Sequence, residues 1–142
     1  MNIQQYRKSL VPLWIKIFGW IFILMSAAIP IMWIVYPFLE LSSPAQFEMF
    51  GLRAVGSPFY WGALIIEGLI IANGISAFGL LFGMGWGVTA CLINGYVGLA
   101  ICIFTMVISG FSTIRLEPLI QVPYLMKLHS LKKKWYEYPA SI

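Results

Sequence analysis

Long apolar runs separated by short polar stretches dominate the chain after its first dozen residues. Three runs are long enough to cross a bilayer as helices, because about 20 residues at about 1.5 Å per residue span the hydrocarbon core. We expect spans over about 13–36, 59–82 and 86–109. Pro30 lies inside the first and is expected to bend it, because proline removes a helical hydrogen bond.

The C-terminal segment over about 116–131 is more ambiguous. It is short for a span, and prolines and charged residues interrupt it. It is either a fourth transmembrane helix or an amphipathic helix on the membrane surface. The expected fold is an all-α integral membrane protein, a single domain over 1–142, with four transmembrane helices or with three plus that amphipathic helix.

The polar segment between the first two spans has a local helix-start signal. Ser43 followed by Pro44 provides an N-cap and a proline at the first helical position. Phe47, Phe50 and Ala54 then recur on one side of successive turns. We expect a short helix lying on the membrane surface.

A tight helical hairpin is expected between the second and third spans, because only Gly-Met-Gly separates them. Small residues recur at helical spacing on one face of each span, which lets two backbones approach closely in lipid. We expect these faces to pack together, although they could also line a ligand site. The expected packing residues are Gly68, Ala72, Ser76, Gly79, Gly83, Gly87 and Gly98.

Three polar side chains, Glu67, Asn73 and Asn94, fall inside the predicted spans. The two asparagines lie at similar depth. They are expected to hydrogen-bond each other or backbone groups of a neighbouring helix, with the lining of a polar path as the alternative.

Glu67 points away from the small-residue face, and an ionised carboxylate facing lipid is costly. Three hypotheses remain open for it. It is a protonated, hydrogen-bonded carboxyl between helices, a group that pairs with a partner chain, or the proton- or cation-coupling group of a transporter.

Charge refines the expected topology. The chain has 9 Lys and Arg against 5 acidic residues, a net charge of +4, and only 10% of its residues are charged. With four spans and both termini inside, only Arg53 and Arg115 face outward and the other 7 of the 9 face the cytoplasm, as the positive-inside rule favours. The lysines expected at lipid headgroups are Lys127, Lys132, Lys133 and Lys134.

Reactive groups are few. The chain has no aspartate, one histidine (His129) and two widely spaced cysteines (Cys91 and Cys102), which are expected to be small packing residues. No catalytic triad, metal-ligand cluster or phosphate-binding loop can be assembled from these residues. We therefore expect no enzymatic activity, no cofactor and no metal site.

These patterns favour a non-catalytic membrane protein that acts through helix packing, as an accessory, assembly or structural subunit of a membrane complex. Its expected partners are the lipid bilayer and either other membrane subunits or a second copy of itself; nucleic acid is not expected, because the basic residues flank apolar segments. The alternative is a small homodimeric proton-coupled or cation transporter that uses Glu67. The expected location is the bacterial cytoplasmic (inner) membrane, with both termini cytoplasmic.

Overall fold

The computed structural model describes residues 2–39, 44–110 and 117–137. Ser43, Arg115 and the first residue of the expected 116–131 segment lie outside these ranges. In chain order the elements are α1 (Ile3–Leu10), α2 (Leu13–Val35), the 3-10 helix η1 (Tyr36–Phe38), β1 (Ala45–Met49), β2 (Leu52–Gly56), α3 (Trp61–Leu81), α4 (Gly87–Ile108) and α5 (Glu117–Tyr136).

Within the described ranges, three helical segments are long and apolar enough to cross a membrane, namely Leu13–Phe38, Trp61–Leu81 and Gly87–Ile108. They confirm the three expected runs and are consistent with integration of the chain into a bilayer. Helix α2 continues through Pro30. Helix α5 is a continuous helix that extends beyond the expected segment to Tyr136, and it is not among the candidate spans.

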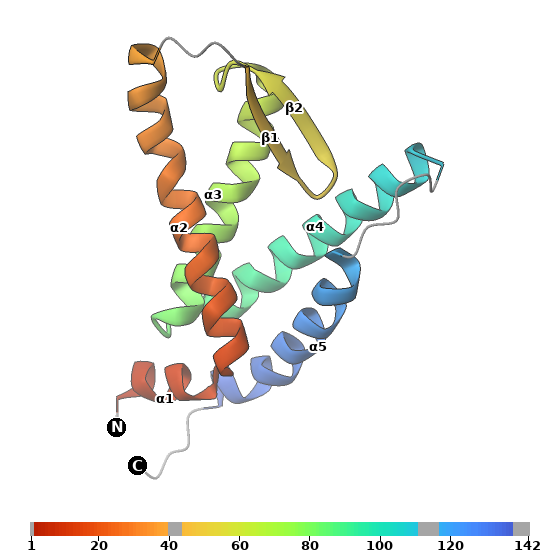
Figure 1. Ribbon diagram of the computed structural model, residues 1–142. Helices are drawn as coiled ribbons and strands as arrows, with labels where there is room; N and C mark the ends of the chain where they lie inside the picture. Colours follow the sequence, from red (N-terminus) through yellow and green to blue (C-terminus); the bar gives the residue numbers. More distant parts are fainter. Residues whose placement is uncertain (1, 40–43, 111–116, 138–142) are drawn as a thin grey trace.

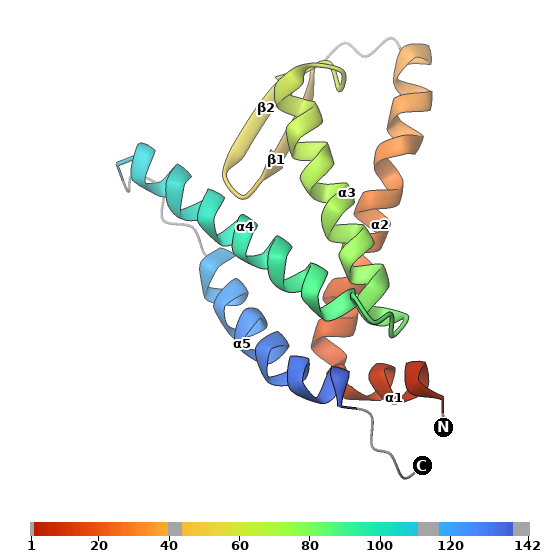
Figure 2. The ribbon, with the colours of Figure 1, turned by 180° about the vertical axis from the view of Figure 1, so that it is seen from behind.

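The helices form two pairs that diverge from one end of the molecule. Helices α2 and α3 lie side by side along their lengths, whereas α4 leans away from α3 and α5 runs back along α4 (Figure 1). The view from behind shows the same divergence, with α1 across the end where the pairs meet (Figure 2). Helix α1 and the last turn of α5 therefore lie at the same end of the molecule.

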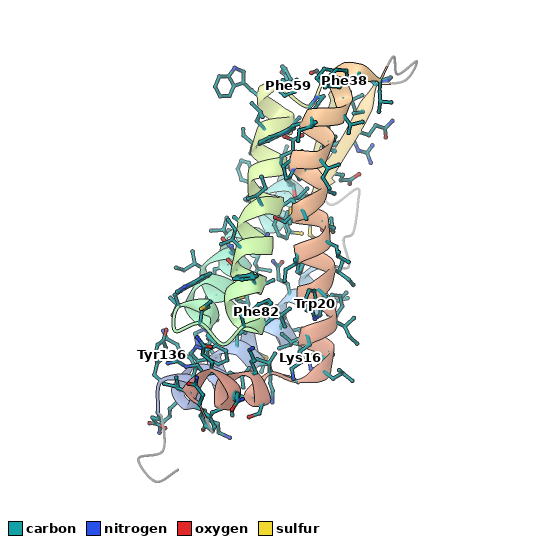
Figure 3. All side chains as sticks on the ribbon, turned by 90° about the vertical axis from the view of Figure 1, so that its left-hand side faces the viewer. Lys16, Trp20, Phe38, Phe59, Phe82 and Tyr136 are labelled. Atoms are coloured by element: carbon teal, nitrogen blue, oxygen red, sulfur yellow. The ribbon has the colours of Figure 1, made fainter. Side chains whose placement is uncertain are left out.

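Aromatic side chains mark both ends of the α2–α3 pair. Phe38 and Phe59 lie at the end that carries the strands, and Trp20, Phe82 and Lys16 lie toward the other (Figure 3). The rings of Trp20 and Phe82 meet edge to face with centroids 6.4 Å apart. This distribution is typical of aromatic side chains at the two interfaces of a membrane.

The segment expected as a surface helix is instead a β-hairpin, so that expectation is wrong and the all-α class is incomplete. Strands β1 and β2 pair antiparallel, with Phe47 opposite Ala54 and Glu48 opposite Arg53. Phe47 and Ala54 are buried, while Arg53 and Glu48 form an exposed ion pair at 2.9 Å. The side chains therefore alternate between buried and exposed with the period of a strand.

The hairpin turn explains why the helix-start signal at Ser43 and Pro44 does not prevail. Phe50 and Gly51 have φ values of 52° and 86°, the left-handed pair that a two-residue type I′ turn requires. The buried face of the hairpin packs on Ile66 and its neighbours in α3. The turn and the burial of one face both stabilise the paired strands. Together they outweigh the local preference for a helix start at Ser43 and Pro44.

The α3–α4 turn is closed by its glycine. Gly83 has a φ of 73°, its N–H donates to the carbonyl of Leu80 at 3.3 Å, and the N–H of Met84 donates to the carbonyl of Gly79 at 2.8 Å. These two bonds form a Schellman motif, which satisfies carbonyls at the end of α3. The expected tight hairpin between the second and third spans is therefore present.

Helices α1 and α5 are anchored to that turn. The Arg7 guanidinium donates to the carbonyl of Trp135 at 3.0 Å and to that of Gly83 at 3.4 Å. The Trp135 indole N–H donates to the carbonyl of Met84 at 3.1 Å. The adjoining core cluster contains Val11, Ile15, Leu80, Val88, Cys91, Leu92, Leu125, Leu128 and Trp135.

We predict that Gly83→Ala lowers the free energy of unfolding by about 1–3 kcal/mol, because a left-handed backbone strains any residue with a Cβ. The new Cβ would also press on the Gln4 carbonyl. Gly85→Ala is the matched control, because a Cβ there would meet only Arg7 Nη1, at 3.6 Å. Denaturant titration in detergent micelles measures both, and equal stability of the two variants would contradict the argument.

Candidate functional site

The small-residue face of α3 packs against α4 over the half of α3 nearest the turn, from Ala72 onward. A Cβ on Gly87 would press on the backbone of Gly79 and Leu80, and a Cβ on Gly79 would press on the ring of Trp86. Further along, the Cys91 thiol donates to the carbonyl of Ser76 at 3.3 Å. Close approach of the two backbones therefore requires small residues in this part of the hairpin.

Gly68, Gly83 and Gly98 were expected in the same contact but lie elsewhere. Gly68 is exposed, and a Cβ there would meet nothing within 4 Å, because α4 has already diverged from α3 at that height. Gly83 faces the Gln4 carbonyl of α1. Gly98 faces Phe50 of the hairpin turn and Gln121 of α5.

Asn94 links α4 to α3. Its amide nitrogen donates to the Ala72 carbonyl at 2.8 Å and to the Ser76 hydroxyl at 2.6 Å. Asn73 donates to the Leu69 carbonyl of its own helix at 3.0 Å. Asn94 therefore bonds to a neighbouring helix and not to Asn73. Asn73 bonds to its own helix instead.

Glu67 is fully buried and meets another helix of the same chain. The Trp33 indole N–H on α2 donates to its Oε2 at 2.9 Å. Its Oε1 is buried without a hydrogen-bond partner among the described residues. The flanking residues Ile66 and Ile70 belong to the core cluster beneath the hairpin. The arrangement is that of a hydrogen-bonded carboxyl between helices.

Glu67 and Trp33 form one of three contacts that sequence reasoning missed. On α2, Gly19, Ser26 and Trp33 recur every seven residues, and on α3 so do Glu67, Gly74 and Leu81. They pair in antiparallel order. A Cβ on Gly19 would meet Leu81 Cδ1 at 3.0 Å, and one on Gly74 would press on Ser26. We call these three pairs the α2–α3 seam.

The seam has the period of antiparallel coiled-coil packing, in which every seventh residue returns to the same face. It becomes visible only once the two helices are placed in antiparallel register, because each member differs in residue type.

The lysines expected at lipid headgroups, Lys127, Lys132, Lys133 and Lys134, are all exposed on α5. Helix α5, which carries them, runs toward the end of the molecule that holds α1. His129 lies on the same helix, and its Nε2 is 2.6 Å from the Tyr96 hydroxyl of α4. Among the described residues there is no group of three or more His, Cys, Asp or Glu that could hold a metal ion.

Divergence of the helix pairs leaves a cavity of about 300 Å³, which we call the lateral cavity. It lies between α2, the hairpin turn, α4 and α5, and Asn73 of α3 reaches it. Its lining residues are Trp14, Phe18, Phe22, Met25, Glu48, Met49, Phe50, Asn73, Gly95, Glu117, Ile120, Gln121 and Tyr124.

The polar groups of the lateral cavity are mainly oxygens. The Gln121 amide nitrogen donates to the Gly95 carbonyl at 3.1 Å, and Gln121 Oε1 is buried without a partner among the described residues. The Glu117 carboxylate accepts from the Cys102 thiol at 3.4 Å. Sequence reasoning missed this cavity, because its walls come from five elements whose relative placement no local pattern specifies.

A second hollow of about 440 Å³ lies on another side of the α2–α3 pair. We call it the α2–α3 groove. Its lining combines small residues with apolar ones and includes Trp86 beside the α3–α4 turn. The residues are Ile23, Ser26, Ala27, Pro30, Ile71, Gly74, Ile75, Phe78 and Trp86.

A scan against protein-family models found no match, and searches of curated proteins and of solved structures found no similar chain. The functional argument therefore depends on the geometry described above.

We predict that Trp33→Phe and Glu67→Leu each lower the free energy of unfolding by about 1–3 kcal/mol, because the first leaves the buried Glu67 carboxyl and the second the half-buried Trp33 indole without this hydrogen bond. The double variant should lose less than the sum of the two, since neither orphaned group remains. Trp20→Phe on the exposed side of α2 is the control and should change stability little. Strict additivity in this double-mutant cycle would show that the bond contributes nothing.

Proposed function

We propose that this chain is a non-catalytic small membrane protein that acts through helix packing, as an accessory, assembly or structural subunit of a membrane complex. The observation that carries the proposal is the α2–α3 groove. We further propose that its occupant is a transmembrane helix of a partner subunit.

The lining of the groove supports this occupant. Ser26, Ala27 and Gly74 are small, and Pro30 has no N–H to satisfy. In lipid, helices associate by van der Waals packing, and small residues allow their backbones to approach closely. A hollow with such a lining accepts the side chains of a second helix better than it accepts mobile acyl chains.

We place the protein in the bacterial cytoplasmic membrane with both termini inside. Helix α5 returns along α4 to the end that holds α1, which supports an even number of passes with α5 as the fourth. The exposed lysines of α5 then contact anionic headgroups on the cytoplasmic side. Arg53, on the hairpin, faces the opposite side.

The transporter alternative has weaker support. Glu67 lines neither the lateral cavity nor the α2–α3 groove. Its Oε2 is engaged by Trp33, and its side chain is fully buried. A coupling carboxylate must be reached by the ion that it carries, so this geometry favours a packing role over transport.

We predict that Ala27→Phe removes the partner subunit from the purified complex, because the new ring fills the groove. Ala28→Phe is the matched control, since Ala28 is the adjacent alanine and is also exposed but does not line the groove. Native mass spectrometry of gently solubilised membranes compares the two variants with the unchanged chain.

The expected result is a stoichiometric complex with the unchanged chain and with Ala28→Phe, and the free subunit with Ala27→Phe. If the unchanged chain is only a monomer or a homodimer, the accessory-subunit proposal fails. If Ala27→Phe retains the partner, the groove is not the docking surface.

We predict that a cysteine at Gln46, on the exposed face of β1, reacts with a membrane-impermeant maleimide in intact cells. A cysteine at Lys133 on α5 should react only after the membrane is opened. Cys91 and Cys102 are buried, so the background labelling should be low. Labelling of Lys133→Cys in intact cells would contradict the proposed cytoplasmic C-terminus.

A further inference from the structure

We propose that the lateral cavity binds a neutral, lipid-soluble phenol, a slender molecule with an aromatic body and a hydroxyl group that donates a hydrogen bond to Gln121 Oε1. Gln121 lines the cavity, and its amide oxygen is buried without a donor among the described residues. The lateral cavity and the α2–α3 groove share no lining residue, so this site goes beyond the proposed function and does not depend on the partner subunit.

The cavity has the dimensions of a site for a slender small molecule. Its volume of about 300 Å³ lies at the lower end of the range for small-molecule pockets, of about 300–1,000 Å³. Its wall on α2 is made by Trp14, Phe18, Phe22 and Met25, which recur every three or four residues along one face of the helix. Eleven residues of helix extend over about 16 Å, so the wall is long relative to the volume that it bounds.

The walls of the cavity favour an aromatic body. Trp14, Phe18 and Phe22 contribute rings from α2, while Phe50 and Tyr124 contribute rings from the hairpin turn and α5. The Trp14 ring already meets the rings of Phe18 and Tyr124 edge to face, with centroids 6.4 and 6.3 Å apart. A further ring packs well in such a wall, because aromatic rings attract one another in edge-to-face and offset geometries.

The amides of the cavity offer oxygens rather than N–H groups. The Gln121 nitrogen donates to the Gly95 carbonyl at 3.1 Å, and Gly98 leaves room for it, since a Cβ there would lie 2.6 Å from this nitrogen. The Asn73 nitrogen donates to the Leu69 carbonyl at 3.0 Å, which leaves its oxygen as an acceptor. A buried acceptor without a donor is unfavourable, so a ligand with an O–H group gains free energy by supplying one.

The surroundings of the cavity select a neutral ligand. Trp14, Phe18 and Met25 are exposed residues of a candidate membrane span, so this side of the cavity faces hydrocarbon. A ligand that enters from hydrocarbon is neutral, because an ion is costly to place there. The lining carboxylates Glu48 and Glu117 already have partners in the protein and take no part in this selection.

An acyl chain and water are the competing occupants. An acyl chain fills the space between the rings but supplies no donor to Gln121 Oε1. Water supplies a donor, but an ordered water needs two to four polar partners and leaves the aromatic wall without packing. A phenol packs against the rings and donates to the amide oxygen at the same time.

The test uses the full-length chain in phosphatidylcholine nanodiscs and isothermal titration calorimetry. The probes are 4-propylphenol and 4-propyltoluene, which has a methyl group in place of the hydroxyl. Empty nanodiscs measure how each probe partitions into lipid, so that affinities are compared at equal concentration in the bilayer. We expect saturable binding of the phenol, about ten-fold tighter than that of the toluene, because only the phenol donates a hydrogen bond.

A first pair of variants tests the acceptor. Gln121→Leu should weaken binding of the phenol about ten-fold and leave that of the toluene unchanged, because only the phenol uses the amide oxygen. Gln46→Leu is the matched control, since it makes the same change on the exposed face of β1, outside the cavity, and should leave both affinities unchanged.

A second pair of variants tests the location. Met25→Trp should abolish saturable binding of both probes, because the larger side chain fills the cavity. Leu24→Trp is the matched control, since Leu24 is the adjacent exposed residue and does not line the cavity. Thermal melting shows whether each variant is folded, and the Met25 and Leu24 pair keeps the proposal testable if Gln121→Leu does not fold.

Three results would overturn the proposal. The first is that neither probe binds the unchanged chain saturably, and the second is that the phenol binds no more tightly than the toluene. The third is that folded Gln121→Leu or folded Met25→Trp binds the phenol as tightly as its control variant does.

Discussion

The α2–α3 seam is the contact on which the rest of the structure depends. Its three pairs place a glycine, a serine or a hydrogen-bonded indole against the partner helix at seven-residue intervals. In lipid there is no hydrophobic force to press two apolar helices together, so close packing and a buried polar bond must hold the register. With α2 and α3 fixed along their full lengths, one rigid pair remains to which the other elements attach.

The second helix pair attaches to this rigid unit at two places. At the end that holds α1, Arg7 and Trp135 donate hydrogen bonds to carbonyls of the α3–α4 turn, and Arg7 also donates to the Trp135 carbonyl. At the other end, the hairpin turn inserts between the pairs. The ring of Phe50 lies against Gly98, and the Phe50 carbonyl accepts from the Thr105 hydroxyl at 3.2 Å. The hairpin thus contacts α3 through its strands and α4 through its turn, and the lateral cavity is the space that it helps to enclose.

The sequence predicts the helices well and their contacts only partly. The three spans follow from apolar runs, which a bilayer selects by length and composition. The contact of Gly79 with Gly87 follows from helical spacing and a short turn. Gly68 has the same spacing but no contact, because α4 has diverged from α3 there, and the Phe50–Gly98 contact beside α4 joins residues far apart in sequence. The hairpin was missed because the Ser43–Pro44 signal is local, whereas the pairing of Phe47 with Ala54 is not.

The Arg7–Trp135 contact joins residues 128 positions apart, close to the two ends of the chain. During synthesis, Arg7 leaves the ribosome long before its acceptor on Trp135, because three membrane-spanning candidates lie between them in the chain. The first helices must therefore enter the membrane with this end of the assembly still open. Closure of so long a loop is entropically unfavourable until the intervening spans have packed. The Arg7–Trp135 contact is thus a late event, which completes a bundle whose seam has already formed.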